Sequence, residues 1–319
     1  MERSDIGSRG MYNGIINVYK EKGFTSHDVV AKLRGILKQK KIGHTGTLDP
    51  DATGVLPVCL GNGTKLCDML TDRSKEYETV LLLGVSTDTE DISGKVLSER
   101  EVCVSEESIR GIIMSFVGEY DQIPPMYSAI KINGKKLYEL AREGREIERK
   151  PRRVVIEALE ITGLKLPRVK FRVVCTKGTY IRSLCRDIGE AAGCGGCMES
   201  LVRTRVGGFF LEEAYTLSSI SALADNGEAY KIITPVDACF EEYPGFAVSG
   251  RTAALVRNGN MFSEDEGGLF LPKDAGENKT GSRFRVYISE DGGENFAGIY
   301  EYDRSMRAYR PVKMFLSGE

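Results

Sequence analysis

The sequence contains no tryptophan, only two histidines, and no apolar run long enough to cross a bilayer. A transmembrane helix needs about 20 consecutive apolar residues, and the longest runs here, such as residues 80–83, fall far short of that. Residues 1–10 are charged and lack an apolar stretch, so we expect a disordered lead-in there and no signal peptide. These absences predict a cytoplasmic protein without a membrane partner.

The eight cysteines show no complete metal-binding pattern. Cys194 and Cys197 have the C-x-x-C spacing, but a zinc site needs two more ligands and no second pair exists. In a reducing compartment most thiols act as small apolar side chains. We therefore interpret residues 194–197 as a glycine-rich turn after a helix, with metal or redox chemistry as the weaker alternative, and we expect no metal site.

The charge of the chain is nearly balanced, with a net value of −2, but it is unevenly distributed. Residues 131–153 hold nine basic and four acidic residues. A local basic surface can hold a phosphate backbone, because counterion release depends on the contacts made and not on total charge. A solvated helix face with paired charges is an equal alternative. With little apolar surface to bury, this segment is expected to stay mobile until nucleic acid orders it.

The apolar periodicity predicts separate strands and helices. Strands are expected at residues 14–18, 76–83 and 169–175, the last with Val169, Phe171 and Val173 on one face. One helix follows a cap at Thr25 or Ser26, and a second follows a cap at Thr179 and ends near Gly193. Their apolar positions are Val29, Val30, Leu33, Ile36 and Leu37, and Ile181, Leu184, Cys185 and Ile188. Without regular βαβ alternation, the class is α+β.

A domain boundary is expected at residues 235–245. Beyond it come β-type runs at 284–288, 296–300 and 311–316, after a long polar loop at 263–282. Short strands separated by turns are typical of a small β-barrel or sandwich.

The most informative stretch is residues 43–65, GHTGTLDPDATGVLPVCLGNGTK. It has neither the Gly-Lys-Ser/Thr order of a phosphate-binding loop nor the GxGxxG spacing of a dinucleotide fold. Pro50 and the nearby glycines suit a rigid loop that presents Asp49 to a large ligand. From the residues alone, Asp49 and Asp51 could simply be turn formers, and without a family that is the favoured interpretation.

Residues 43–65 closely resemble the catalytic-loop motif of the TruB family, the tRNA pseudouridine-55 synthases. Four more segments resemble motifs of that family in the same order: residues 75–94, 123–144, 175–182 and 201–209. Two departures stand out. Tyr19-Lys20-Glu21 replaces the usual Asp-Lys-Pro, and the polar insertion at 263–282 is atypical. Neither touches the expected catalytic set.

The resemblance implies a pseudouridine synthase fold with a mixed, largely antiparallel central sheet, flanking helices and a thumb-like insertion at about 123–153. The catalytic domain would span 11–240, and a small PUA-like RNA-binding β domain would span 246–319. The enzyme would isomerise a uridine in the T-arm of tRNA to pseudouridine, a reaction without redox or energy input that implies no cofactor. It would act as a monomer and need no protein partner.

The resemblance also assigns roles to single residues. Asp49 would be the nucleophile, at the ribose C1′ or the uracil C6, with Arg182 favouring its ionised form. Tyr77 would stack on the flipped base and take its C5 proton, and His44 would fill the space that the base leaves. Tyr180 would bind the uridine or position Arg182, and Leu201 would wall the pocket. The expected RNA contacts are Lys20, which could instead support the loop, and Lys131, Lys135, Lys136 and Arg142.

Each assignment has a plainer alternative. The tyrosines and Leu201 could be core residues, Arg182 a surface ion pair, and His44 a satisfied loop histidine. Two other functions also compete. One is a guide-RNA-dependent synthase, against which stands the lack of long basic extensions, and the other is an RNA chaperone that keeps the fold without the chemistry.

Overall fold

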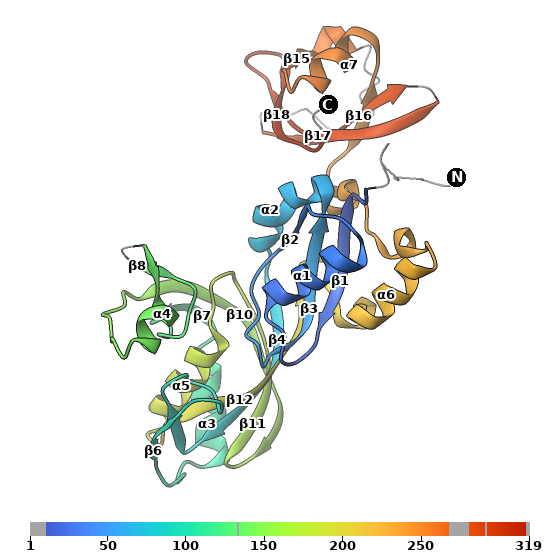
Figure 1. Ribbon diagram of the computed structural model, residues 1–319. Coiled ribbons are helices and arrows are strands. Elements are labelled where there is room, and N and C mark those ends of the chain that lie inside the picture. Colours follow the sequence, from blue (N-terminus) through green and yellow to red (C-terminus); the bar gives the residue numbers. More distant parts are fainter. Residues whose placement is uncertain (1–10, 133, 268–280, 291, 317–319) are drawn as a thin grey trace.

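The computed structural model describes residues 11–132, 134–267, 281–290 and 292–316 (Figure 1). The lead-in predicted at 1–10 and most of the polar insertion predicted at 263–282 lie outside these residues. The described residues contain one large and one smaller sheet with helices around both, which confirms the α+β class. Among them, no helix is both long enough and apolar enough to cross a membrane.

The large sheet is mixed and largely antiparallel, as expected, because within it only β3 and β12 pair in parallel. Its strands follow in the spatial order β1 (Gly14–Lys20), β3 (Thr53–Leu60), β12 (Gly196–Val206), β4 (Lys75–Leu83), β11 (Arg168–Cys175), β10 (Arg152–Lys165) and β7 (Gly118–Gln122). Two short strands extend it: β2 (Ile42–His44) on β3, and β13 (Phe209–Phe210) on β12. The sequence predictions for β1, β4 and β11 are confirmed, including the buried face of Val169, Phe171 and Val173.

Helix α1 (Ser26–Ile36) begins as predicted. The Thr25 side chain accepts from the backbone N–H of Asp28, and the Asp28 carboxylate accepts from the backbone N–H of Thr25, which is a capping box. The buried positions Val29, Val30 and Leu33 pack α1 on β1 and β3 together with α6 (Leu217–Asp225). This half of the domain holds one side of the candidate site.

Helix α5 (Ile181–Ala191) carries the predicted apolar stripe on the other half of the sheet, beside α3 (Glu106–Met114). Its predicted cap is wrong. Tyr180 is the N-cap, and the Thr179 hydroxyl donates instead to the Thr176 carbonyl at 2.9 Å. After α5 the chain turns through Gly193 and Gly195, both with positive φ, and β12 begins at Gly196. The turn predicted at residues 194–197 therefore ends earlier than expected, and Cys197 already lies in the strand. Cys194 and Cys197 are buried free thiols.

The insertion projects sideways from the sheet (Figure 1) and is folded. Hairpin β8 (Lys131–Ile132) and β9 (Lys135–Lys136) leads into helix α4 (Leu137–Arg142). Leu137 and Leu140 are 1% and 4% exposed, so the expectation of too little apolar surface to order this segment is wrong. A second small hairpin, β5 (Val85–Thr87) and β6 (Val96–Glu99), lies near α5.

The smaller sheet forms a separate C-terminal unit with α7 (Gly250–Arg257) at one end of the molecule (Figure 1). Its strands are β14 (Gly245–Val248), β16 (Arg283–Glu290), β17 (Gly293–Asp303), β18 (Ala308–Met314) and β15 (Phe262–Ser263). Phe296, Ile299 and Phe315 of this unit share an apolar cluster with Phe240 and with the end of the large sheet near α2 (Cys67–Thr71). The two units therefore pack through an apolar junction.

Candidate active site

The glycine-rich loop between β2 and β3, residues 45–52, is fixed at several points. The backbone N–H of Leu48 donates to the Ser26 hydroxyl of α1 at 2.9 Å, and the Thr45 carbonyl accepts from the Thr71 hydroxyl at 2.9 Å. Just after it, Gly54 has φ +108, and a Cβ there would lie 2.2 Å from the Arg203 carbonyl oxygen of β12. Only glycine fits that close approach, so the loop enters β3 along a fixed path.

Lys20 binds the backbone of this loop from β1. Its ammonium donates to the carbonyl oxygens of Ala52 at 2.6 Å, Pro50 at 3.1 Å and Glu21 at 3.2 Å, and the residue is fully buried. Burial lowers the pKa of this lysine to about 8, although Asp49 and Asp51 oppose the shift. Of its two expected roles, this geometry supports the loop contact and leaves no surface for an RNA phosphate.

Asp49 faces Arg182 in a two-point ion pair. Arg182 Nε lies 2.9 Å from Oδ2 of Asp49, and Nη2 lies 3.1 Å from Oδ1. The arginine side chain is 5% exposed, whereas that of Asp49 is 37% exposed. A two-point pair fixes the orientation of the carboxylate as well as its charge. Asp49 is thus a held carboxylate with an open side, while Asp51 is exposed at the surface.

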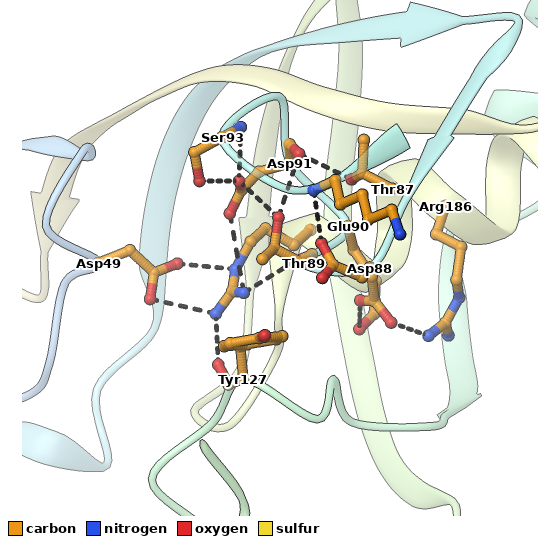
Figure 2. Close-up of polar contacts among 12 residues, drawn as sticks. Asp49, Thr87, Asp88, Thr89, Glu90, Asp91, Ser93, Tyr127 and Arg186 are labelled. Carbon is orange, nitrogen blue, oxygen red and sulfur yellow. Dashed lines mark hydrogen bonds and ion pairs between the residues drawn. The ribbon is translucent and has the colours of Figure 1, made fainter. Parts of the chain in front are cut away.

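The remaining donors of Arg182 are also occupied (Figure 2). Nη1 donates to the Thr89 carbonyl at 3.0 Å and lies 3.8 Å from Oδ2 of Asp91, and Nη2 donates to the Tyr127 carbonyl at 2.9 Å. Asp91 is itself held by Thr89 and by the backbone and hydroxyl of Ser93. Arg182 is therefore oriented by three separate segments of the chain.

Tyr77 and Leu201 lie beside the loop in one apolar cluster with Leu48 and Ala52. Tyr77 on β4 is 8% exposed, and so is Leu201 on β12. Burial raises the pKa of the Tyr77 phenol, against the opposing effect of the Arg203 guanidinium. Both residues are therefore buried against the loop that carries Asp49.

Arg203 is the main residue to which sequence reasoning gave no role. It is 1% exposed, is the cross-strand neighbour of Tyr77, and donates from Nε to the Val55 carbonyl at 2.7 Å. Its Nη2 has no hydrogen-bond partner among the described residues. Burial lowers the pKa of Arg203, and the Tyr77 phenol counteracts that shift. An arginine two residues after Leu201, on the inward face of a strand, was the available signal.

Tyr180 is the N-cap of α5, and His44 ends β2 directly before the loop. The Gln122 side chain accepts from the backbone N–H of Tyr180 at 2.8 Å and donates to its carbonyl at 3.0 Å. Burial raises the pKa of the Tyr180 phenol and lowers the pKa of the His44 imidazole. His44 Nδ1 accepts from the backbone N–H of Gly46, so its neutral form is favoured.

Unlike Lys20, the other four basic residues predicted to bind RNA lie on the insertion. Lys131 and Lys135 are exposed, and Lys135 lies 3.2 Å from Glu143. Lys136 and Arg142 lie over the Tyr138 ring, at 5.3 and 5.5 Å from its centroid. They form a basic and aromatic surface that is exposed at Lys131, Lys135 and Arg142 and partly buried at Lys136 and Tyr138.

Chemically, the site offers one open carboxylate, a fixed guanidinium, and a buried phenol beside apolar walls. Such an arrangement suits nucleophilic attack by the carboxylate on an uncharged planar substrate stacked on Tyr77. Across the described ranges, no three His, Cys, Asp or Glu side chains gather as metal ligands would.

Comparison with protein families places this site in a class. Residues 34–181 match the N-terminal domain of the TruB family of pseudouridylate synthases, and these residues hold Asp49, Tyr77 and Tyr180. Residues 182–241, which hold Arg182 and Leu201, match the C-terminal domain of tRNA pseudouridylate synthase B. The chain is thus a pseudouridylate synthase by class, and it belongs to the TruB family.

The sequences of individual relatives align with almost the whole chain. The tRNA pseudouridine synthase B of Lachnoclostridium phytofermentans is 55% identical over 95% of this chain and 100% of that protein. The protein of the same name from Bacillus pumilus is 43% identical over 95% of this chain and 98% of its own.

Among solved structures, a chain of an H/ACA RNP bound to a substrate RNA containing 2′-deoxyuridine has a TM-score of 0.68. It is 26% identical and covers 95% of this chain and 85% of that chain. The pseudouridine synthase fold implied by the sequence motifs is therefore confirmed.

Proposed function

We propose that this enzyme isomerises uridine-55 in the T-loop of tRNA to pseudouridine, without a cofactor and with Asp49 as the nucleophile. The observation that carries the proposal is the two-point pair between Arg182 and a half-exposed Asp49 in a loop fixed on both sides. The names of the relatives in Lachnoclostridium and Bacillus support tRNA as the substrate. The enzyme would work in the cytoplasm, as a monomer.

The reaction breaks the C–N glycosidic bond, turns the uracil, and joins ribose C1′ to uracil C5. Asp49 attacks either C1′ or uracil C6, holds one fragment covalently, and leaves when the new bond closes. The C5 proton passes to the phenolate form of Tyr77 and N1 gains a proton, so no atom is gained or lost. Arg203 supports the Tyr77 step, because a buried cation beside a phenol favours its ionised form.

The target uridine must leave its stack to reach Asp49, at a cost of a few kcal/mol. His44, neutral and half-buried at the edge of the loop, would fill the space that the base leaves. Tyr180 would bind the uridine, and Leu201 would wall the pocket. Residues 11–240 would form the catalytic domain with its insertion at 123–153, and residues 246–319 would form a PUA-like domain that binds the tRNA body.

The test uses the purified full-length chain and unmodified tRNA transcript, with no added protein or RNA. Pseudouridine should form at position 55, and a transcript in which cytidine replaces uridine-55 should gain none. Product only after a guide RNA is added would favour the guide-dependent alternative. Binding without any product, under conditions that are productive for a relative, would favour an RNA chaperone.

A further inference from the structure

Helix α5 presents two arginines, four residues apart, toward the start of the insertion. Side chains at this spacing leave a helix on the same face. Arg182 binds Thr89 and Tyr127 as described above. One turn further on, Arg186 forms an ion pair with Glu90, donates from Nη2 to the Ile123 carbonyl at 3.2 Å, and donates from Nε to Asp187 at 2.7 Å. Both arginines therefore bridge residues 87–91 and the start of the insertion. Figure 2 shows the pair of Arg186 with Glu90.

Glu90 is an unusual residue for its position. It has φ +64, a left-handed conformation that non-glycine residues adopt only when their surroundings require it. Its residue exposure is 7%, and its carboxylate accepts from the Ser183 hydroxyl of α5 at 2.6 Å in addition to pairing with Arg186. Glu90 lies between Thr89 and Asp91, the two residues of this turn that contact Arg182. Its anchoring therefore sets the position of both.

More contacts join α5 to the chain that enters the insertion. Gln122 binds the backbone of Tyr180, and the Tyr120 hydroxyl binds the Asp187 carboxylate. We call these contacts, with those of Arg182 and Arg186 to residues 123 and 127, the α5 seam. The seam runs from Tyr120 in β7 to Tyr127, shortly before the basic hairpin of the insertion.

We propose that Arg186, acting through Glu90 and the Ile123 carbonyl, is a positioning residue for the reaction. It holds the 87–91 turn and the start of the insertion on α5, and thereby sets the orientation of Arg182 toward Asp49. RNA bound by the insertion is joined to the catalytic pair through the same seam. This inference rests on the proposed function, because it assumes that Arg182 and Asp49 act on a bound uridine.

The test compares Arg186→Gln, Glu90→Gln and the wild type in single-turnover pseudouridine formation at saturating enzyme, with the tRNA dissociation constant measured separately. We expect the rate of each variant to fall about 10- to 100-fold, the scale expected when a reacting group is slightly misplaced. The dissociation constant should stay within about threefold. Arg186→Lys keeps a cation beside Glu90 and should recover part of the rate.

The matched control is Arg100→Gln. Arg100 also reaches α5, but it pairs with Glu190 at the far end of the helix, 3.4 Å away and with both side chains about half exposed. Its rate should equal that of the wild type, because exposed pairs contribute little. A second measurement combines Arg186→Gln with Arg182→Lys. If Arg186 acts through Arg182, the double variant is no slower than Arg182→Lys alone.

A normal rate in folded Arg186→Gln and Glu90→Gln would overturn the inference, and so would fully additive losses in the double variant. If Arg186→Gln does not fold, Glu90→Gln and Arg186→Lys decide the matter by the same criteria. Failure of the wild type to form pseudouridine would instead overturn the proposed function. The two failures are thus distinguishable.

Discussion

Asp49 and Asp51 lie two residues apart in one loop and meet different surroundings. Arg182 holds the carboxylate of Asp49 at two points, whereas Asp51 is exposed and has Pro50 fixing the backbone before it. We therefore expect these two chemically equal side chains to differ in function.

Replacing Asp49 by Asn keeps the shape of the side chain and removes its nucleophilicity. We expect turnover to fall by at least about 10,000-fold, or about 5 kcal/mol of transition-state stabilisation. Binding of tRNA should stay within about tenfold, because affinity comes from phosphate contacts spread over the surface. The measurement is single-turnover pseudouridine formation, with binding determined on the same preparation. Asp51→Asn is the matched control, and robust product from Asp49→Asn beside an inactive Asp51→Asn would reverse the assignment.

Lys20 gives a prediction about alkaline stability. Its pKa is about 8 in the folded chain and 10.5 as a free side chain, so between these pH values the unfolded state binds more protons. Stability must then rise with pH across this window through this group. The difference in unfolding free energy between the wild type and Lys20→Met should therefore change in favour of the wild type from pH 8 to pH 10. A difference that is flat with pH would contradict the buried charge.

Sequence patterns could identify Asp49, Tyr77 and Arg182 because a family motif carries each of them. They could not decide between the two roles expected of Lys20, RNA contact and loop support, because its three carbonyl partners come from the backbone of two segments. Arg203 was also missed, because its importance depends on the strand that places it opposite Tyr77.

At the scale of elements, predictions succeeded where the spacing of apolar residues keeps one period along the whole helix or strand. Helix α1 and strand β11 are such cases. Strand β10 was not predicted, and it has register shifts near residues 156–158 and 161–163 that break the alternation of inward and outward side chains. Strand β12 has similar shifts. The cap of α5 was assigned to the wrong residue because Thr179 uses its hydroxyl within the preceding turn.

The basic hairpin and α4 of the insertion yield a prediction about salt. If Lys135, Lys136 and Arg142 contact phosphates, their joint replacement by Ala should lower the slope of log K against log salt by about two to three. The control replaces three basic residues of β11, which pair with Glu199, Glu78 and Glu160: Arg168, Lys170 and Arg172. These three residues lie on the large sheet and outside the insertion, so that slope should not change. If both triple variants change the slope equally, the insertion has no special part in RNA binding.

At the scale of the whole molecule, the C-terminal unit and the large sheet share an apolar junction. Phe240 lies 6.0 Å from Phe315 and 6.5 Å from Phe296, between ring centroids, and Lys65 donates to the Leu316 carbonyl at 3.2 Å. Such a junction favours one relative orientation of the two units.

Removing residues 246–319 should raise KM for tRNA and leave kcat within about tenfold, the pattern of lost uniform binding. It should also lower the melting temperature, because the deletion exposes Phe240 and its neighbours. Both constants are to be measured at a temperature where circular dichroism shows the truncated chain folded. A folded truncated enzyme with unchanged KM and no turnover would contradict this division of labour.

The three carbonyl oxygens around Lys20 form a binding site for a monovalent cation, and the Lys20 ammonium is the cation that occupies it. Shortening the side chain in Lys20→Ala would empty this site while leaving the carbonyl dipoles of Glu21, Pro50 and Ala52 convergent. A small alkylammonium ion added to the solution could then bind where the Lys20 ammonium lies in the wild type. The order of the loop at residues 45–52 would then depend on the added amine. The activity of that variant would follow the concentration and size of the amine.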